Sequence, residues 1–127
     1  MSRAVLDASA LLALLQGEPG AAEVAEMIPD VAMSAINLSE VVTKLIERGL
    51  PEADAHVAVE GLGIQFVDFD REQAYEVASM RPSTRAIGLS LGDRACLVLA
   101  RRLGLPAVTT DRAWTRARVG VAVRVAR

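Results

Sequence analysis

The chain has 127 residues, a formal net charge of −2, and 52% hydrophobic but only 3% aromatic residues. This length predicts a single domain, residues 1–127, with a core of Leu, Val, Ala and Ile. The composition excludes a disordered chain and an aromatic base-stacking platform for RNA. With one cysteine and one histidine, the chain cannot form an internal disulfide and is poorly supplied for a zinc site or for Cys–His catalysis.

The predicted elements alternate between strands and helices along the chain. We expect strands at 3–6, 31–34, 64–69, 107–109 and 121–125. We expect helices at 8–16, 21–28, 35–48, 51–62, 70–80 and from Asp93 to Leu103, with a loop at 81–88. This alternation predicts an α/β fold in which helices cover both faces of a mostly parallel five-stranded sheet, in a flavodoxin-like three-layer α/β/α sandwich.

The N-terminal segment superficially resembles a signal peptide, since Arg3 is followed by a mainly apolar run. Asp7 interrupts that run and no clear cleavage site precedes Glu18. No apolar run in the chain reaches the roughly 18 uncharged residues that a membrane span needs. We therefore expect a soluble, cytoplasmic protein that does not enter a membrane.

The charges are distributed unevenly along the chain. Residues 81–127 contain ten arginines and only two acids, Asp93 and Asp111, each within an Asp-Arg-Ala tripeptide. Residues 1–80 contain fourteen acids against four basic residues. The clustered arginines, Arg94 and Arg112 among them, could form a surface for nucleic acid, although solvated surface arginines and a bias in coding are equally good explanations.

Four acids occupy the same kind of position in the predicted fold. Asp7 follows the first strand, Glu40 lies near the start of the helix after the second, Asp93 starts a helix and Asp111 follows the fourth strand. Because strand ends and helix starts meet at one edge of a parallel sheet, these side chains can lie close together. For a single aspartate, helix capping is the simpler explanation. The repetition of the pattern favours a site.

Clustered carboxylates repel one another unless a cation lies among them. Mg²⁺, or alternatively Mn²⁺, suits a set of hard oxygen ligands. Such an ion activates water and binds phosphoryl oxygens, which is what phosphodiester hydrolysis requires. Ser9 and Thr109 could support a ligand carboxylate or a water through hydrogen bonds, or serve only in a helix cap and a strand.

The segments VLDAS, NLSEVV, LSLGDRACLVLA and PAVTTDRAW resemble the PIN-domain ribonucleases, most closely the VapC-type toxins of bacterial toxin–antitoxin pairs. The resemblance covers essentially the whole chain. It implies that Asp7, Glu40, Asp93 and Asp111 are the four catalytic acids, with Asp7, Asp93 and Asp111 holding the metal and Thr109 matching a hydroxyl residue of the last motif. It also implies Mg²⁺-dependent endonucleolytic cleavage of RNA, strand order 3-2-1-4-5, a homodimer, and inhibition by a cognate antitoxin.

Two other functions are compatible with the fold class. A phosphoacceptor receiver-type signalling domain would use Asp68 or Asp70 after the third strand. Such domains resemble one another in an acidic pair after the first strand and a lysine after the fifth, whereas here Asp7 stands alone and Lys44 is the only lysine. The other alternative is a binding domain whose acids only cap helices; metal binding separates it from the enzyme.

Overall fold

Five strands form one parallel sheet in the computed structural model, which describes residues 1–127. They are β1 (Ala4–Leu6), β2 (Val31–Ser34), β3 (Gln65–Val67), β4 (Ala107–Thr109) and β5 (Val123–Val125). The spatial order is β3-β2-β1-β4-β5, which confirms the expected order. Receiver-type domains share the three-layer architecture but have the order 2-1-3-4-5, with the third strand inside the sheet. Here β3 lies at the edge, so the topology counts against the receiver alternative.

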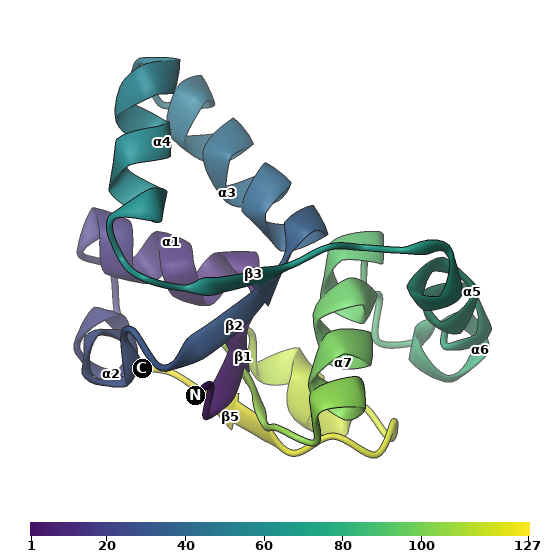
Figure 1. The fold of residues 1–127 in the computed structure, drawn as a ribbon. Coiled ribbons are helices and arrows are strands. Elements are labelled where there is room, and N and C mark those ends of the chain that lie inside the picture. Colours follow the sequence, from purple (N-terminus) through teal and green to yellow (C-terminus); the bar gives the residue numbers. More distant parts are fainter.

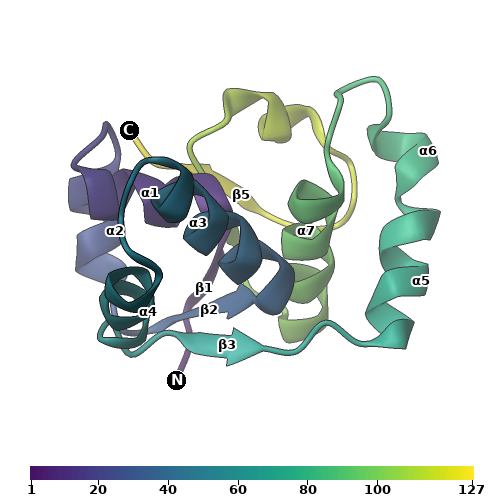
Figure 2. The same cartoon turned by 90° about the horizontal axis from the view of Figure 1, so that it is seen from above.

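The helices divide into two groups, one on each side of the sheet (Figure 1). One group comprises α1 (Ala8–Gln16), α2 (Ala21–Met27), α3 (Ala35–Glu47) and α4 (Glu52–Glu60). The other comprises α5 (Arg71–Ser79), α6 (Arg81–Thr84) and α7 (Leu91–Leu103). Figure 2, seen from above, shows α1 to α4 well separated from α5 and α6. This arrangement confirms the three-layer α/β/α architecture.

Alternate residues of the central strands pack into two different cores. Leu6 and Met33 belong to the cluster under α1, α2, α3 and α4, whereas Val5 and Ala32 belong to the cluster under α5 and α7. Side chains alternate between the faces of a strand, so a sheet covered on both faces needs apolar residues at every position. All three residues of β1 are buried, as this arrangement requires.

Some element boundaries differ from the prediction. The segment 81–88, expected to be a loop, contains the short helix α6. We interpreted Pro82 as a loop residue, but it lies in the first turn of this helix, where a proline loses no backbone hydrogen bond. The strands predicted at 64–69 and 121–125 are shorter, since β3 and β5 form the sheet edges and pair on one side only. A 3-10 helix, η1 (Arg112–Arg116), follows β4 and was not predicted.

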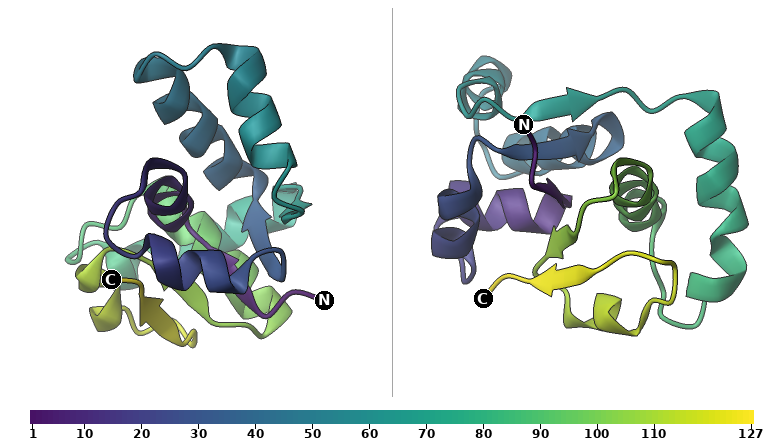
Figure 3. Two further views of the ribbon diagram at one scale, coloured as in Figure 1. Left: turned by 90° about the vertical axis from the view of Figure 1, so that its left-hand side faces the viewer. Right: turned by 60° about the horizontal axis from the view of Figure 1, so that its bottom comes forward.

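The carboxyl ends of β1, β2 and β4 point toward one edge of the sheet, where α1, α3 and η1 begin. Figure 3 shows that α3 and α4 form a hairpin that extends well beyond the sheet. Helix α7 also begins on this side and contacts both α3 and β2. The fold therefore brings Asp7, Glu40 and Asp93 to the same edge. No helix combines the length and apolar character needed to cross a membrane.

Candidate functional site

Asp7 is the most buried carboxylate of the site, with only 4% of its surface exposed. It follows β1 directly and is the N-cap of α1, where its Oδ1 accepts a hydrogen bond from the Ala10 backbone N–H at 2.8 Å. A short polar side chain is favoured at this position because it satisfies an otherwise unpaired N–H of the first turn. The cap fixes the direction of the carboxylate at the sheet edge.

Two hydroxyl groups hold the Asp7 carboxylate. Thr109 Oγ1 donates to Asp7 Oδ2 at 2.6 Å, and Ser9 Oγ lies 2.7 Å from Oδ1 and 2.9 Å from Oδ2. Thr109 is fully buried at the end of β4, and its Oγ1 also accepts from the Asp111 backbone N–H at 3.1 Å. Ser9 Oγ accepts from the Thr110 N–H at 3.0 Å. Both hydroxyls thus link α1 to the end of β4, and their role in support of a metal ligand stays a prediction.

Burial raises the pKa of Asp7 from 3.8 to about 6, and the negative charge of Asp93 adds to this effect. The hydrogen bonds from Thr109, Ala10 and Ser9 stabilise the carboxylate and work in the opposite direction. Desolvation is the largest of these effects, and no ion pair with a basic residue offsets it. Asp7 is a buried anion that lacks a cation.

Asp93 lies in the first turn of α7, which begins two residues earlier, at Leu91. Its Oδ2 accepts from the Ser90 N–H at 2.9 Å while Ser90 Oγ accepts from the Asp93 N–H at 3.1 Å, forming a capping box. The predicted start of this helix at Asp93 was therefore two residues late. The capping box leaves the other carboxylate oxygen of Asp93 free of protein hydrogen bonds.

Glu40 lies in the second turn of α3 and reaches the first turn of α7. Its Oε1 accepts from Asn37 Nδ2 at 2.8 Å, and the same amide donates to the Gly92 carbonyl at 2.9 Å. A Cβ atom at Gly92 would overlap the Glu40 carboxylate. Glycine at position 92 therefore lets the Glu40 carboxylate lie directly against the first turn of α7, and a larger residue there would displace it.

Asp111 differs from the other three acids. It is exposed, lies two residues beyond β4, and its Oδ1 accepts from the Ala113 N–H at 2.9 Å as the N-cap of η1. Thr109 connects it to Asp7, because Thr109 Oγ1 donates to the Asp7 carboxylate and accepts from the Asp111 N–H. The buried Trp114 anchors η1 beneath it. Asp111 is thus attached to the edge of the site and faces solvent.

The charges of Asp7, Asp93 and Glu40 converge on Cys96, a fully buried residue of α7. Burial raises the pKa of the Cys96 thiol well above its usual value, and these three carboxylates raise it further. The thiol is therefore an inert, protonated part of the core, in keeping with the sequence analysis. All three carboxylates are therefore near enough to the second turn of α7 for their charges to act on the thiol.

The donor set of this edge suits a hard divalent cation, since it consists of carboxylate and hydroxyl oxygens and none of the four acids forms an ion pair. No three of the His, Cys, Asp and Glu side chains lie close enough to hold an ion directly. Mg²⁺ commonly binds through one or two carboxylates and retains several waters. The residues present therefore fit Mg²⁺ with part of its water shell retained. That Asp7, Asp93 and Asp111 are its ligands stays a prediction.

Four of the ten arginines in residues 81–127 use their side chains to bind the protein itself: Arg81, Arg94, Arg101 and Arg102. Arg94 donates to the Val77 carbonyl at 2.9 Å and to the Ser90 carbonyl at 3.3 Å. Arg102 forms ion pairs with Glu72 and Glu76, and its hydrogen bond to Glu76 raises its pKa further. Arg94 and Arg102 therefore have structural roles, and the arginine content of residues 81–127 overstates a surface for nucleic acid.

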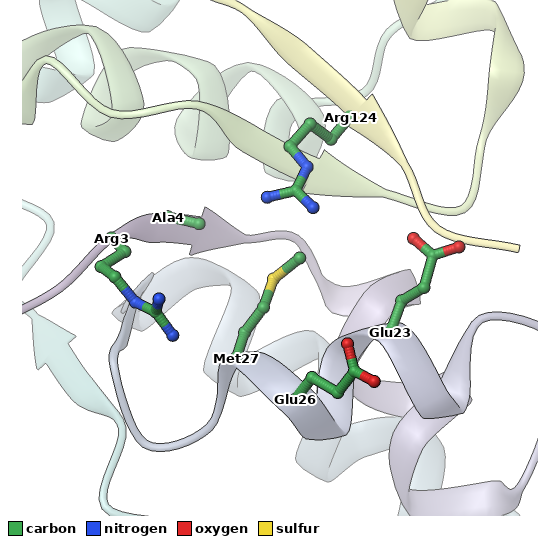
Figure 4. Close-up of a pocket in the computed structure, with 6 residues that line it drawn as sticks. All are labelled: Arg3, Ala4, Glu23, Glu26, Met27 and Arg124. Atoms are coloured by element: carbon green, nitrogen blue, oxygen red, sulfur yellow. The ribbon is translucent and has the colours of Figure 1, made fainter.

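Two surface hollows differ in how close they lie to the carboxylates of the site. One, of about 430 Å³, is lined by Arg3 and Ala4 of β1, by α2 and by Arg124 of β5, whose side chains face a common space (Figure 4). It contains none of the four acids. Another, of about 320 Å³, includes Ser9 and Thr110 together with Arg48 of the α3 C-cap. Only this second hollow adjoins the carboxylates.

A model of the PIN domain family matches residues 4–120. The chain belongs to the PIN domain family. No curated protein matches the sequence. The family membership confirms the resemblance drawn from the sequence and removes the receiver alternative.

Solved structures share this PIN fold over nearly the whole chain. A DNA-bound VapBC from Salmonella typhimurium is 21% identical, with 98% of each chain covered and a TM-score of 0.74. A toxin–antitoxin complex from Klebsiella pneumoniae is 21% identical, covering 94% of this chain and 95% of that one, with a TM-score of 0.72. VapC20 of Mycobacterium tuberculosis, described as a toxin that cleaves the sarcin–ricin loop, is 17% identical, with coverages of 94% and 98% and a TM-score of 0.74. At these identities the likeness shows the fold alone.

Sequence reasoning missed Asn37 and Gly92, which contact Glu40 in this PIN domain. Asn37 precedes Glu40 by three positions, so the two share a helix face, and this spacing was a usable signal. Gly92 directly precedes the predicted helix start at Asp93, a position where glycine gives only a weak signal of close packing. Neither signal shows that the two residues meet across 55 positions of sequence.

The raised pKa of Asp7 predicts how the stability of the metal-free protein depends on pH. The folded protein binds this proton more tightly than the unfolded chain, because the pKa is about 6 when folded against 3.8 for an unperturbed carboxyl. The free energy of unfolding should therefore rise as pH falls from 7 through 6 toward 4, by up to roughly 3 kcal/mol from Asp7 alone. Asp7→Asn should remove this contribution. Urea unfolding in EDTA at pH 7 and pH 5 measures it, and equal pH dependence in both proteins would contradict the assignment.

Proposed function

We propose that this PIN domain is a Mg²⁺-dependent endoribonuclease that acts as the toxin of a toxin–antitoxin pair. The observation that carries the proposal is the convergence of Asp7, Glu40 and Asp93 at one sheet edge without a basic partner. An anionic cluster of this kind costs stability and is expected where a functional cation binds. Mn²⁺ fits the same donor set.

The residues have distinct tasks under this proposal. Mg²⁺, when bound, supplies Lewis-acid activation of water and charge stabilisation at the phosphoryl group. Asp7, Asp93 and Asp111 would hold the ion, with Glu40 assisting either as a ligand or through a water. Ser9 and Thr109 keep both oxygens of Asp7 oriented, and the capping box keeps Asp93 in place. The result would be hydrolysis of an RNA phosphodiester bond.

Proteins that share this fold support the toxin assignment and an antitoxin partner. The Salmonella typhimurium structure is a VapBC complex, the Klebsiella pneumoniae structure is a toxin–antitoxin complex, and VapC20 is described as a toxin that cleaves an RNA loop. We extend these properties to this chain, together with a homodimer, because its fold matches theirs over at least 94% of its length.

Asp93→Asn should abolish RNA cleavage while leaving the fold intact. The amide oxygen can still accept from Ser90, so the helix cap survives, but one negative charge is lost from the metal site. We expect cleavage in millimolar Mg²⁺ to fall on the order of 100-fold or more. Asp54→Asn, a matched change in the first turn of α4, should leave it unaltered. Cleavage by the wild type that persists in excess EDTA would refute metal dependence.

We propose that Arg48 contacts the RNA backbone beside the cleavage point. It lines the hollow that shares Ser9 and Thr110 with the carboxylate site, and it forms no ion pair. Glu18 lines the same hollow, so the phosphate would lie on the Arg48 side of it. A guanidinium group binds a phosphate through parallel N–H donors.

Arg48→Ala should weaken RNA binding and reduce its dependence on salt. Loss of one phosphate contact lowers the slope of log K against log salt concentration by about 0.7 for single-stranded RNA. The measurement uses Asp93→Asn protein, in which cleavage does not interfere. Arg124→Ala is the matched control, because Arg124 is an exposed arginine lining the hollow away from the acids. Equal slopes for the two variants would remove Arg48 from the RNA path.

Co-expression with the product of an adjacent small gene should give a stable complex with suppressed nuclease activity. Gel filtration at micromolar concentration tests the association, and light scattering of the protein alone tests for the homodimer. Separate elution of the two proteins, with cleavage unaffected by mixing them, would contradict the antitoxin assignment.

A further inference from the structure

Asn37 is a buried amide between α3 and α7, with 1% of its surface exposed. Its Nδ2 donates to Glu40 Oε1 at 2.8 Å and to the Gly92 carbonyl at 2.9 Å. Both partners are acceptors only, so the NH₂ group must face them. Its Oδ1 consequently points elsewhere and has no hydrogen-bond partner.

The amide and the glycine hold Glu40 from two sides. Asn37 binds the carboxylate from the preceding turn of α3, while the backbone of Gly92 lies directly against it. Gly92 is the neighbour of Asp93 in the first turn of α7. The position of Glu40 relative to Asp93 is thus set by the pair Asn37 and Gly92, which joins the two helices at the site.

The unpaired Oδ1 indicates that this amide is not optimised for folding. A buried acceptor without a partner lowers stability, and an apolar side chain of similar size would avoid that loss. What the apolar side chain would lack is the pair of donors to Glu40 and Gly92. The benefit of Asn37 therefore lies in those two hydrogen bonds.

We propose that Asn37 is a positioning residue for the nuclease, whose amide links Glu40 to the Gly92 carbonyl and so holds the α3 carboxylate beside Asp93. The proposal rests on the proposed function for its catalytic consequence. The amide itself contacts neither substrate nor metal, and it acts only through Glu40.

The chain offers a matched control in Gln73 of α5. Gln73 is also a buried amide, 4% exposed, with Nε2 donating to the Asp68 carbonyl at 3.0 Å and Oε1 unpaired. Its side-chain amide binds no carboxylate, and only its backbone N–H donates to Asp70 Oδ1, in the α5 cap. Replacement by leucine removes a buried amide in both cases, with two hydrogen bonds lost at Asn37 and one at Gln73, but only Asn37 touches the acidic site.

The test compares Asn37→Leu with Gln73→Leu in RNA cleavage and in thermal melting. Asn37→Leu should lower kcat by about 10- to 100-fold, the usual effect of losing a group that orients a ligand, and leave KM within about 3-fold. Gln73→Leu should keep wild-type kcat, with a similar change in melting temperature. Equal kcat for the two variants, whether both reduced or both normal, would overturn the proposal.

A second experiment tests the hydrogen bond without using activity. Asn37→Asp places two carboxylates together and should lower the melting temperature in EDTA, or prevent folding. In the double variant that adds Glu40→Gln, the new amide donates and the new carboxylate accepts, so one hydrogen bond is restored with its direction reversed. This variant should recover at least half of the lost melting temperature, or should fold again if Asn37→Asp alone does not fold. No recovery would overturn the link between the two residues. Wild type that fails to cleave RNA would refute the proposed function, and the melting result would still judge this link.

Discussion

The buried carboxylate at the end of β1 is the constraint on which the rest of the site depends. Asp7 is 4% exposed and desolvation dominates its pKa. A carboxylate in this position must be hydrogen-bonded, which accounts for Ser9 on α1 and Thr109 on β4. These hydroxyls also bind the backbone of Thr110 and Asp111, so satisfying one anion organises the loop that follows β4.

Helix capping and site formation use the same side chains. Asp7 and Asp111 are N-caps, and Asp93 belongs to a capping box. The start of a helix carries partial positive charge and free N–H groups, so it stabilises a carboxylate locally while orienting it. The choice between capping aspartates and a functional cluster is therefore not exclusive. Caps at adjacent strand ends are a simple way to hold several acids near one point.

The four acids are unequal in what holds them. Asp7 is fixed by three hydrogen-bond donors and Glu40 by one amide of its own helix, α3, whereas Asp111 faces solvent at the start of a 3-10 helix. Mg²⁺ tolerates such a mixed set because it retains waters in place of missing protein ligands. The rigid part of the site is therefore the group around β1 and α7, and Asp111 is attached to it through Thr109.

The sequence by itself determined the layers and the positions of the acids along the chain. Apolar periodicity located α1, α3 and β2 nearly to the residue, because the period reports burial directly. Placing Asp7 and Asp111 after strands was likewise a local inference. The prediction of elements from the sequence was wrong at α6, where Pro82 was interpreted as a loop signal. It was also wrong in the lengths of β3 and β5, where one-sided pairing shortened the strands.

Only the tertiary structure decided which of these residues meet. Thr109 reaches Asp7 across 102 positions and Asn37 reaches Gly92 across 55. In the folded protein, several C-terminal arginines also donate hydrogen bonds to backbone carbonyls and to Glu76, so they are not free on an open surface. Local sequence patterns report the periodicity and burial of each segment. The distance between two side chains depends on how the segments pack, and packing is a property of the whole chain.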